Sequence, residues 1–401
     1  MDSILVEMTA IGTVAVALFG AACCFMQSRH SHVAQSFAVF LIAIAVNNLP
    51  EAFSQILATI PSGTKSVADL VTWPSSFFLA PLFWLYVLRL TSSEHEGTKR
   101  LFWHLSLPIA SIIVTLIVLV MPSEFREGLY SEDPQMDTAL DVTIAIFMGL
   151  LHLTLFPQIA FYLILILRRL ARFRLKLRDY YSSTERYELR WIYVIGGLGF
   201  LFWSANTLLL FIVAGYEQAP PWAVNLASVA GFILVSAIAL WGLRQHPPLA
   251  PDSDDPPAQA KVQTGGKYEK SALSSEASER LSRKLRNAME VDQLHRDANL
   301  SLWDLASHIG ASSNYISQTL NEVIGESFFD FVNAYRIAEA KRMLATTNES
   351  VLNITYDVGF NARSSFYNAF KRHTGQTPTS YRKKMSNPEG MDDMPRQIKD
   401  T

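Results

Sequence analysis

The chain has few of the residues that build reactive sites. Its 401 residues include two cysteines, Cys23 and Cys24, which are neighbours inside an apolar run, so a disulfide framework is excluded. The sequence also lacks a glycine-rich phosphate loop, a metal-spaced set of Cys and His, and the nucleophile elbow of hydrolases. We therefore expect no enzymatic activity, no cofactor and no metal site.

Charge is also scarce in the first 243 residues, where the sequence forms long apolar runs. A helix needs about 20 apolar residues to cross the hydrocarbon core of a membrane. Seven runs reach that length: residues 4–26, 33–57, 67–90, 101–121, 139–167, 191–214 and 223–243. No Lys or Arg precedes the first run, so we expect no cleavable signal peptide. Residues 1–244 are predicted to form a seven-span membrane sensor domain.

The basic residues between these runs predict the orientation. One set of loops carries twelve Lys or Arg, whereas the other set carries only Lys65 and Arg126. Loops rich in positive charge face the cytoplasm, so the amino terminus is expected outside and the chain from Arg244 onward inside. The richest loop, residues 168–190, is best explained as topology-setting; lipid binding or relay of a signal is the alternative.

The composition changes after the last apolar run. Residues 245–270 are rich in Pro, Asp, Gln and Gly, which is typical of a disordered cytoplasmic linker. A connecting helix is predicted within residues 271–298, over residues 275–296, because Leu281, Leu285 and Met289 share one face. This helix either packs on the domain that follows, which we favour, or pairs two protomers. Residues 386–401 are expected to form a disordered tail.

Residues 299–385 contain an internal duplication. A helix with an apolar stripe ends at Gly310 and a second ends near Gly325; the pattern returns 49 to 50 residues later, ending at Gly359 and Gly375. Two short helices joined by a glycine-containing turn form a helix-turn-helix, and such a repeat is hard to produce by chance. Residues 328–345 predict a connecting helix of roughly 27 Å, which suits recognition helices about one DNA turn, roughly 34 Å, apart.

The second repeat carries a recognisable set of motifs. They are Asp357-Val358-Gly359-Phe360, Ser365-Phe366, Phe370-Lys371, Gly375-Gln376-Thr377-Pro378 and Tyr381-Arg382. These motifs resemble the signature of the AraC/XylS family over about a fifth of the chain. The resemblance implies a bacterial transcription regulator whose two helix-turn-helix units bind DNA through the second helix of each. Thr355 stands where the family usually has Ala, which is tolerable if its hydroxyl bonds to a backbone carbonyl.

The resemblance places candidate base-reading residues in the second helix of each unit. They are Asn314, Tyr315, Ser317, Gln318, Arg363, Ser364, Ser365, Tyr367 and Asn368. Amide side chains suit adenine and arginine suits guanine. The first of these helices has no Lys or Arg, so its grip on phosphate is expected to be weak. Candidate phosphate contacts therefore lie in the second unit, at Lys371, Arg372, Arg382 and Lys383.

Polar residues inside the apolar runs are candidates for a ligand or signalling site, because they are costly in a bilayer. They are Glu51, Asn47, Asn48, His152 and Asn206. Glu51 is expected well inside the second run, with His152 or Asn206 as its partner. The alternative is a set of hydrogen bonds that fixes the packing of the helices.

The expected fold is all-α: a seven-helix transmembrane bundle followed by a soluble two-unit helix-turn-helix DNA-binding domain. The expected function is a regulator in the bacterial inner membrane that couples a signal sensed by the bundle to transcription. A transporter with an appended regulatory domain and a passively anchored regulator without a ligand site remain alternatives. The expected partners are double-stranded DNA in two successive major grooves, the lipid bilayer and an unidentified ligand. A second copy of the chain and RNA polymerase are further candidates.

Overall fold

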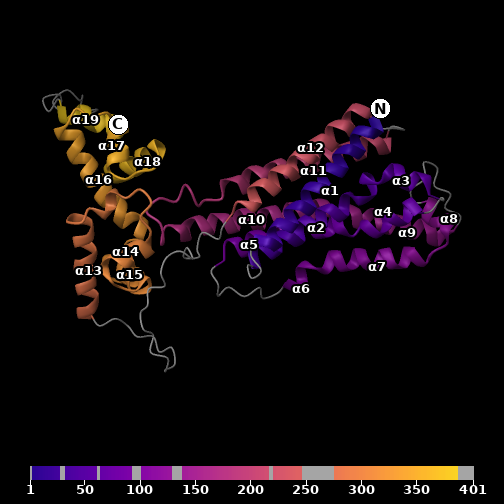
Figure 1. The fold of residues 1–401 in the computed structure, drawn as a ribbon, viewed down its shortest axis with the longest axis horizontal. Coiled ribbons are helices and arrows are strands. Elements are labelled where there is room, and N and C mark those ends of the chain that lie inside the picture. The colour runs from indigo at the N-terminus through magenta and orange to yellow at the C-terminus, as the bar shows by residue number, and fades with distance from the viewer. Residues whose placement is uncertain are drawn as a thin grey trace, which may run out of the picture. The chain divides into compact units, whose positions relative to one another are not determined.

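The computed structural model describes residues 2–27, 32–60, 64–92, 101–128, 138–215, 220–245 and 275–386. These residues are mostly helical and contain no strand, which confirms the expected all-α fold class (Figure 1). The chain divides into two compact units, one of residues 1–171 and 189–250 and the other of residues 172–188 and 251–401. The predicted linker beyond Gln245 and the predicted tail beyond Ser386 lie outside the described residues.

Most of the described residues up to Leu243 lie in helices, and most of these helices are apolar. They are α1 (Asp2–Gln27), α2 (His32–Ala52), α3 (Ser54–Thr59), α4 (Thr64–Thr72), α5 (Ser75–Leu90), α6 (Leu101–His104), α7 (Ser106–Val120), α8 (Ser123–Gly128), α9 (Ala139–Leu153), α10 (Leu155–Leu177), α11 (Arg190–Gly215) and α12 (Pro221–Leu243). Among the described residues, five stretches are long and apolar enough to cross a membrane: Ile4–Met26, His32–Ala52, Thr64–Leu90, Ala139–Leu177 and Pro221–Leu243. The apolar helix α7 is shorter, and α11 covers the sixth predicted run as one helix.

Proline explains why several predicted spans are divided into two helices. The breaks at Leu105, between α6 and α7, and at Thr154, between α9 and α10, each lie three residues before a proline, Pro108 or Pro157. A proline lacks the N–H for the helical hydrogen bond, and its ring clashes with the carbonyl four residues earlier. The chain also breaks at Pro74, between α4 and α5.

The second predicted span is shorter than expected. The helix α2 ends at Ala52, soon after Pro50, and a separate short helix follows from Ser54. Glu51 is therefore next to the last residue of α2 and does not lie well inside a continuous span. This difference changes the environment of the carboxylate, because the end of a spanning helix is closer to water than its middle is.

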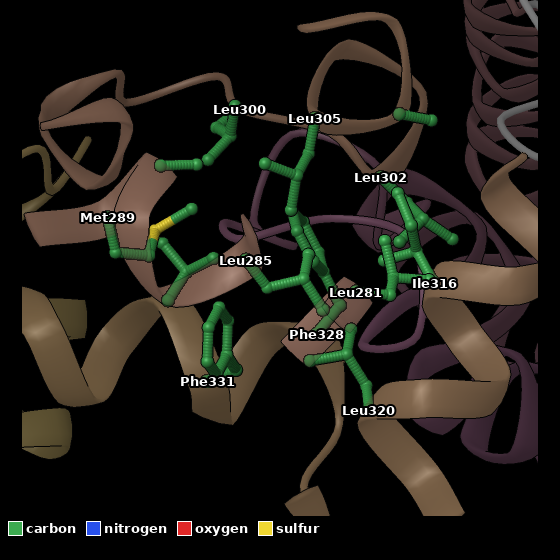
Figure 2. Packing of buried hydrophobic residues seen from close by; sticks show 13 residues of the cluster. Leu281, Leu285, Met289, Leu300, Leu302, Leu305, Ile316, Leu320, Phe328 and Phe331 are labelled. Atoms are coloured by element: carbon green, nitrogen blue, oxygen red, sulfur yellow. The ribbon is translucent and has the colours of Figure 1, made fainter. Parts of the chain in front are cut away.

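The second unit holds the helices that follow the linker. They are α13 (Ser275–Glu290), α14 (Leu302–Ile309), α15 (Ser313–Thr319), α16 (Phe328–Thr346), α17 (Val351–Asp357), α18 (Arg363–Thr374) and α19 (Pro378–Ser386). They pack around two apolar cores, one on the first half of α16 and the other on its second half. Figure 2 shows the first core, in which side chains from α13, α14, α15 and α16 converge. The second core contains Ile337, Ile354, Val358, Phe366 and Phe370.

The helix predicted over residues 275–296 ends earlier, at Glu290. His295 provides the physical reason, because its Nδ1 lies 2.9 Å from the carbonyl oxygen of Met289 and satisfies it in place of another helical turn. Gln293 takes a left-handed backbone with φ of 54°, and a short 3-10 turn follows. The apolar face of α13 is buried in the first core, which confirms the favoured interpretation that this helix packs on the domain that follows.

The structure repeats the duplication that the sequence contains. The helix α14 corresponds to α17, α15 to α18, and the start of α16 to α19. Gly310 and Gly359 both follow the first helix of a unit and take left-handed backbones, with φ of 66° and 92°. The copies differ in the second helix, because α15 ends in a π-helical turn at Leu320–Ile324 whereas α18 runs for 12 residues.

Replacement of Gly359 by alanine should destabilise the second unit more than the matched Gly310→Ala change. A Cβ on Gly359 would lie 2.5 Å from the carbonyl oxygen of His295, whereas one on Gly310 would meet no atom within 4 Å. The positive φ alone costs about 1–2 kcal/mol in either variant, so Gly359→Ala should cost clearly more than that. Thermal unfolding of both full-length variants in nanodiscs provides the measurement, and equal losses would contradict the clash.

Candidate DNA interface and membrane cavity

The first candidate recognition helix, α15, presents its predicted polar residues on its outer face. Asn314 and Tyr315 are exposed, and Ser317 and Gln318 are half-buried, whereas Ile316 between them is fully buried. This alternation follows from the helical period, which turns Ile316 toward the first core. The Nε2 of Gln318 donates to the carboxylate of Glu322 at 2.9 Å, so the side-chain carbonyl of Gln318 stays available as an acceptor.

The second candidate recognition helix, α18, begins with an exposed arginine. Arg363 and Ser364 are exposed and Ser365 is half-buried. The guanidinium of Arg363 lies 4.9 Å from the ring centre of Tyr367 and donates to its hydroxyl at 3.2 Å. The hydrogen bond from Thr379 and the nearby Arg363 lower the pKa of Tyr367. Stacking holds the arginine in a defined direction, which reduces the entropy lost on contact with a base.

The predicted phosphate-contacting cations differ in their exposure. Lys371, Arg372 and Lys383 are exposed, and so is the base-reading candidate Asn368. Arg382 is half-buried, and its Nε and one terminal nitrogen are buried without a hydrogen-bond partner among the described residues. Lys371, Arg372 and Lys383 are therefore better placed for phosphate than Arg382.

The hydroxyl of Thr355 makes the backbone hydrogen bond that a threonine at this position needs. The residue is fully buried on α17, and its hydroxyl donates to the carbonyl of Val351 at 2.8 Å. This bond satisfies the polar group inside the second core. A threonine at this position is thus compatible with the helix-turn-helix packing.

Sequence reasoning missed one element of the second unit, residues 172–188, which comprise the end of α10 and the loop that follows it and are called here the loop of residues 172–188. It adds a short extended segment to the domain: Tyr181 forms an antiparallel bridge with Ser301. The carbonyl of Tyr180 accepts from the N–H of Leu302 at 2.8 Å, and the N–H of Ser182 donates to the carbonyl of Leu300 at 3.2 Å. These residues precede and begin α14, so the loop holds the entrance to the first helix-turn-helix unit.

Side chains extend the contact between this loop and the domain. Arg178 binds Asp330 on α16 through two hydrogen bonds of 2.6 and 2.8 Å, and its guanidinium lies 5.0 Å from the ring centre of Phe329. Tyr180 stacks on Trp303, with ring centres 5.2 Å apart. The run of tyrosines and small hydroxyl residues from Tyr180 to Thr184, uncharged within a basic loop, was the available sequence signal.

A buried arginine completes this contact. Arg336 on α16 is fully buried and donates to the carbonyl of Ser182 at 3.2 Å and to its hydroxyl at 2.9 Å. Its other donors reach the carbonyls of His295 and Asp297, both at 2.7 Å. The loop therefore supplies acceptors for a charge that lies inside the domain.

The first unit brings four of the five predicted ligand residues to one cavity. Asn47, Asn48, Glu51 and Asn206 line a cavity of about 520 Å³ between α1, α2, α5, α10, α11 and α12. The fifth, His152, is not among its lining residues. Its Nδ1 accepts a hydrogen bond from the indole of Trp73 at 3.2 Å, which fits the packing interpretation for this residue.

Comparison with known proteins also places a helix-turn-helix domain in the second unit. Residues 305–384 match the helix-turn-helix domain family. An uncharacterised HTH-type transcriptional regulator of Staphylococcus aureus (strain COL) is 35% identical over 99 residues, which are 25% of this chain and 13% of that protein. The melibiose operon regulatory protein of Escherichia coli (strain K12) is 31% identical over 87 residues, which are 22% of this chain and 29% of that protein.

A solved structure was also found. The C-terminal domain of AraT, a response regulator from Geobacillus stearothermophilus, is 25% identical, and the match covers 30% of this chain and 94% of that chain with a TM-score of 0.24. The chain spans only 13% of the length of the Staphylococcus relative and 29% of the melibiose regulator, so the likeness concerns a domain. That domain, residues 305–384, is a helix-turn-helix domain. It is of the AraC type, as its motifs indicate.

Replacement of Arg363 by alanine should weaken DNA binding at a single base position. If the guanidinium contacts a guanine through two hydrogen bonds, its loss should cost about 1–3 kcal/mol for that base pair and little for non-specific DNA. Titration of the variant against operator DNA changed at one position at a time gives the measurement. An equal loss for every DNA sequence would show that Arg363 contacts phosphate.

The Gln318→Ala variant should behave differently in salt. Gln318 carries no charge, so its removal should relax base preference in the other half-site and leave the salt dependence of binding almost unchanged. Lys371→Ala provides the contrast, since loss of one phosphate contact should reduce the salt slope by about 1. Both variants are titrated at several salt concentrations, and a flatter slope for Gln318→Ala would contradict its assignment as a base reader.

Proposed function

We propose that this protein is a membrane-integrated, sequence-specific transcription regulator. The support for DNA binding is the helix-turn-helix domain at residues 305–384 and its likeness to named transcriptional regulators. The support for membrane integration is the set of five apolar stretches that have the length to span a bilayer. The excess of Lys and Arg in one set of loops supports a cytoplasmic DNA-binding domain and an external amino terminus in a bacterial inner membrane.

The two exposed recognition faces support contact with successive major grooves of double-stranded DNA. We assign base contacts to the predicted residues on α15 and α18, and phosphate contacts mainly to Lys371, Arg372 and Lys383. The helix α16, which connects the units, has 19 residues and a length of about 28 Å. That length suits two helices that read adjacent turns of one face of DNA.

The single observation that favours signal coupling over passive anchoring is the place of residues 172–188. This loop belongs to the compact unit of the DNA-binding domain, although α10 and α11 on either side of it belong mostly to the first unit. A passive anchor needs only a tether, which the linker after α12 already provides. A second, structured attachment lets a change in α10 or α11 reach α14 and α16 directly.

Reversal of the charge of Arg178 should therefore uncouple the loop. The Arg178→Glu change places a carboxylate against Asp330 and removes an ion pair that is about two-thirds buried on both sides. Like-charge repulsion together with the lost pair should alter the affinity of full-length protein for operator DNA by about threefold to tenfold. Hydrogen exchange at the N–H groups of Ser182, Leu302 and Phe329, which bond across this contact, should accelerate.

The control for this experiment is Arg186→Glu. It makes the same change of charge in the same loop, at an exposed side chain. Its DNA affinity and exchange rates should stay near those of the wild type. If Arg178→Glu frees the loop but leaves DNA binding and promoter activity unchanged, the membrane part is a passive anchor.

A further inference from the structure

The cavity of the first unit has the size and lining of a ligand site. Its volume of about 520 Å³ lies within the range of roughly 300–1,000 Å³ that is typical of small-molecule sites. Most of its lining is aliphatic or aromatic, and Glu51 is the one lining residue among those described that carries a formal charge. Glu51 is exposed and lies next to the last residue of α2, so it places a negative charge where the apolar wall of the cavity meets the more polar end of the helix.

Close helix contacts set the relative heights of the helices around the cavity. A Cβ on Gly12 of α1 would lie 2.9 Å from the ring of Phe232 on α12, so these two positions are level. A Cβ on Gly231 of α12 would lie 3.2 Å from the ring of Phe202 on α11. The helices α1, α11 and α12 therefore meet at one height, near the residues 12, 202 and 232.

Several polar lining residues lie about one turn away from that height, on the same side of it, while Thr13 lies next to Gly12. Thr9 precedes Gly12 on α1, Ser228 precedes Gly231 on α12, and Asn206 follows Phe202 on α11, which runs in the opposite direction. Glu51 joins them from α2, because the N–H of Gln55, one turn further, donates to the carboxylate of Glu7 on α1 at 3.4 Å. The cavity thus has one polar end.

The polar end offers acceptors. The Nδ2 of Asn48 donates to the carbonyl of Ile44 at 2.9 Å, and the Nδ2 of Asn206 donates to the carbonyl of Phe202 at 2.8 Å. One N–H of each amide is therefore engaged within its own helix, and the amide oxygens can act as acceptors. The Glu51 side chain is exposed at the same end of the cavity. The end presents two amide oxygens and one negative charge.

The opposite end of the cavity is mostly apolar, and its polar member Tyr162 has its hydroxyl 2.9 Å from Nδ1 of His104. From Glu51 back to Phe40 the helix α2 covers about 16 Å, and Ile166, Ile195 and Ile238 line the same end. Such a space fits a hydrocarbon chain. A chain already dissolved in lipid gains little by moving into a cavity of similar polarity, so the polar end must select the ligand.

We propose that this cavity binds an amphiphile with a primary ammonium head and a hydrocarbon chain. The three N–H groups of the ammonium donate to the carboxylate of Glu51 and to the amide oxygens of Asn48 and Asn206, and the chain extends toward Phe40 and Ile238. An anionic head would be repelled by Glu51, and an alcohol would leave the carboxylate without a counter-charge. The site deepens the proposed function, because it names the chemical class of the signal.

The test measures binding to the full-length protein in phosphatidylcholine nanodiscs without DNA. The probes are dodecylamine, dodecanol and dodecanoate, which share one chain and differ in the head. The signal is the change in tryptophan fluorescence relative to a Trp203→Phe variant, which isolates the contribution of Trp203 in the cavity wall from that of the other seven tryptophans. Dodecylamine should bind saturably and at least about tenfold more tightly than dodecanol, because a charge-assisted hydrogen bond is stronger than a neutral one. Equal or tighter binding of dodecanol or dodecanoate would overturn the proposal.

Substitutions then locate the site. Glu51→Gln should lose about tenfold in affinity for dodecylamine and leave dodecanol binding unchanged, whereas Glu51→Asp should keep the preference for the amine. The matched control is Glu7→Gln, which removes a carboxylate from the same end of the bundle but outside the cavity lining. Unchanged amine affinity in a folded Glu51→Gln protein would also refute the site. If that variant does not fold, the site is tested by the amine preference of Glu51→Asp and by the relative affinities of dodecylamine, dodecanol and dodecanoate.

Two sources can supply the ammonium head, a free amine or the ethanolamine head of a membrane lipid. A lower apparent affinity for dodecylamine after phosphatidylethanolamine is added to the nanodiscs indicates competition by the lipid, and an unchanged affinity indicates a free amine; both results support the site. The proposed function is tested separately by adding operator DNA. Amine binding without any change in DNA affinity would contradict the coupling alone, and absence of amine binding would contradict the site alone.

Discussion

The second unit depends on one buried positive charge, the guanidinium of Arg336. Burial lowers the pKa of this group to about 10, so it is still protonated at neutral pH. A buried charge is tolerated only when its donors are satisfied, and the removal of its partners can cost about 3–5 kcal/mol. The acceptors come from Ser182 in the loop and from His295 and Asp297 in the turn before α14, while Phe360 lies 5.4 Å from the guanidinium carbon. One side chain thus links the loop, the first core and the edge of the second.

This constraint makes the state of the loop part of the stability of the DNA-binding unit. If residues 172–188 left the domain, Arg336 would lose its bonds to Ser182, and Asn333 would lose a bond of 3.3 Å to the same carbonyl. Water would have to enter the space to replace these acceptors. Glu339, held by His295 and Arg296, would still tie α16 to the turn before α14. Release of the loop would therefore loosen the domain without separating its two cores.

The sequence predicted the duplicated part of the fold well, because local patterns determine it. Gly310 and Gly359 mark the ends of two helices by residue type alone, and the helical period separates the buried from the exposed face of α15 and α18. The sequence predicted less of the structure where contacts between distant residues determine it. The early end of α13 depends on His295, which bonds to a carbonyl six residues earlier in the chain. From the sequence alone, Arg336 would be expected at the surface, whereas the structure buries it among its acceptors. The docking of the loop through Tyr181 joins segments 120 residues apart, which no periodicity encodes.

Free energies limit how much of this contact the proposed signal coupling would have to change. A tenfold change in an equilibrium requires about 1.4 kcal/mol, which is comparable to one or two hydrogen bonds in a folded protein. The loop makes several such bonds, a two-bond ion pair from Arg178 and a stacking contact at Tyr180. Complete release would cost far more than a single bound ligand is expected to supply, since allosteric coupling energies are typically about 1–3 kcal/mol. A partial change, in which α10 turns slightly and Arg178 moves away from Asp330 while Ser182 stays on Arg336, matches that energy. The proposed coupling is therefore energetically better served by adjustment of a docked loop than by its release.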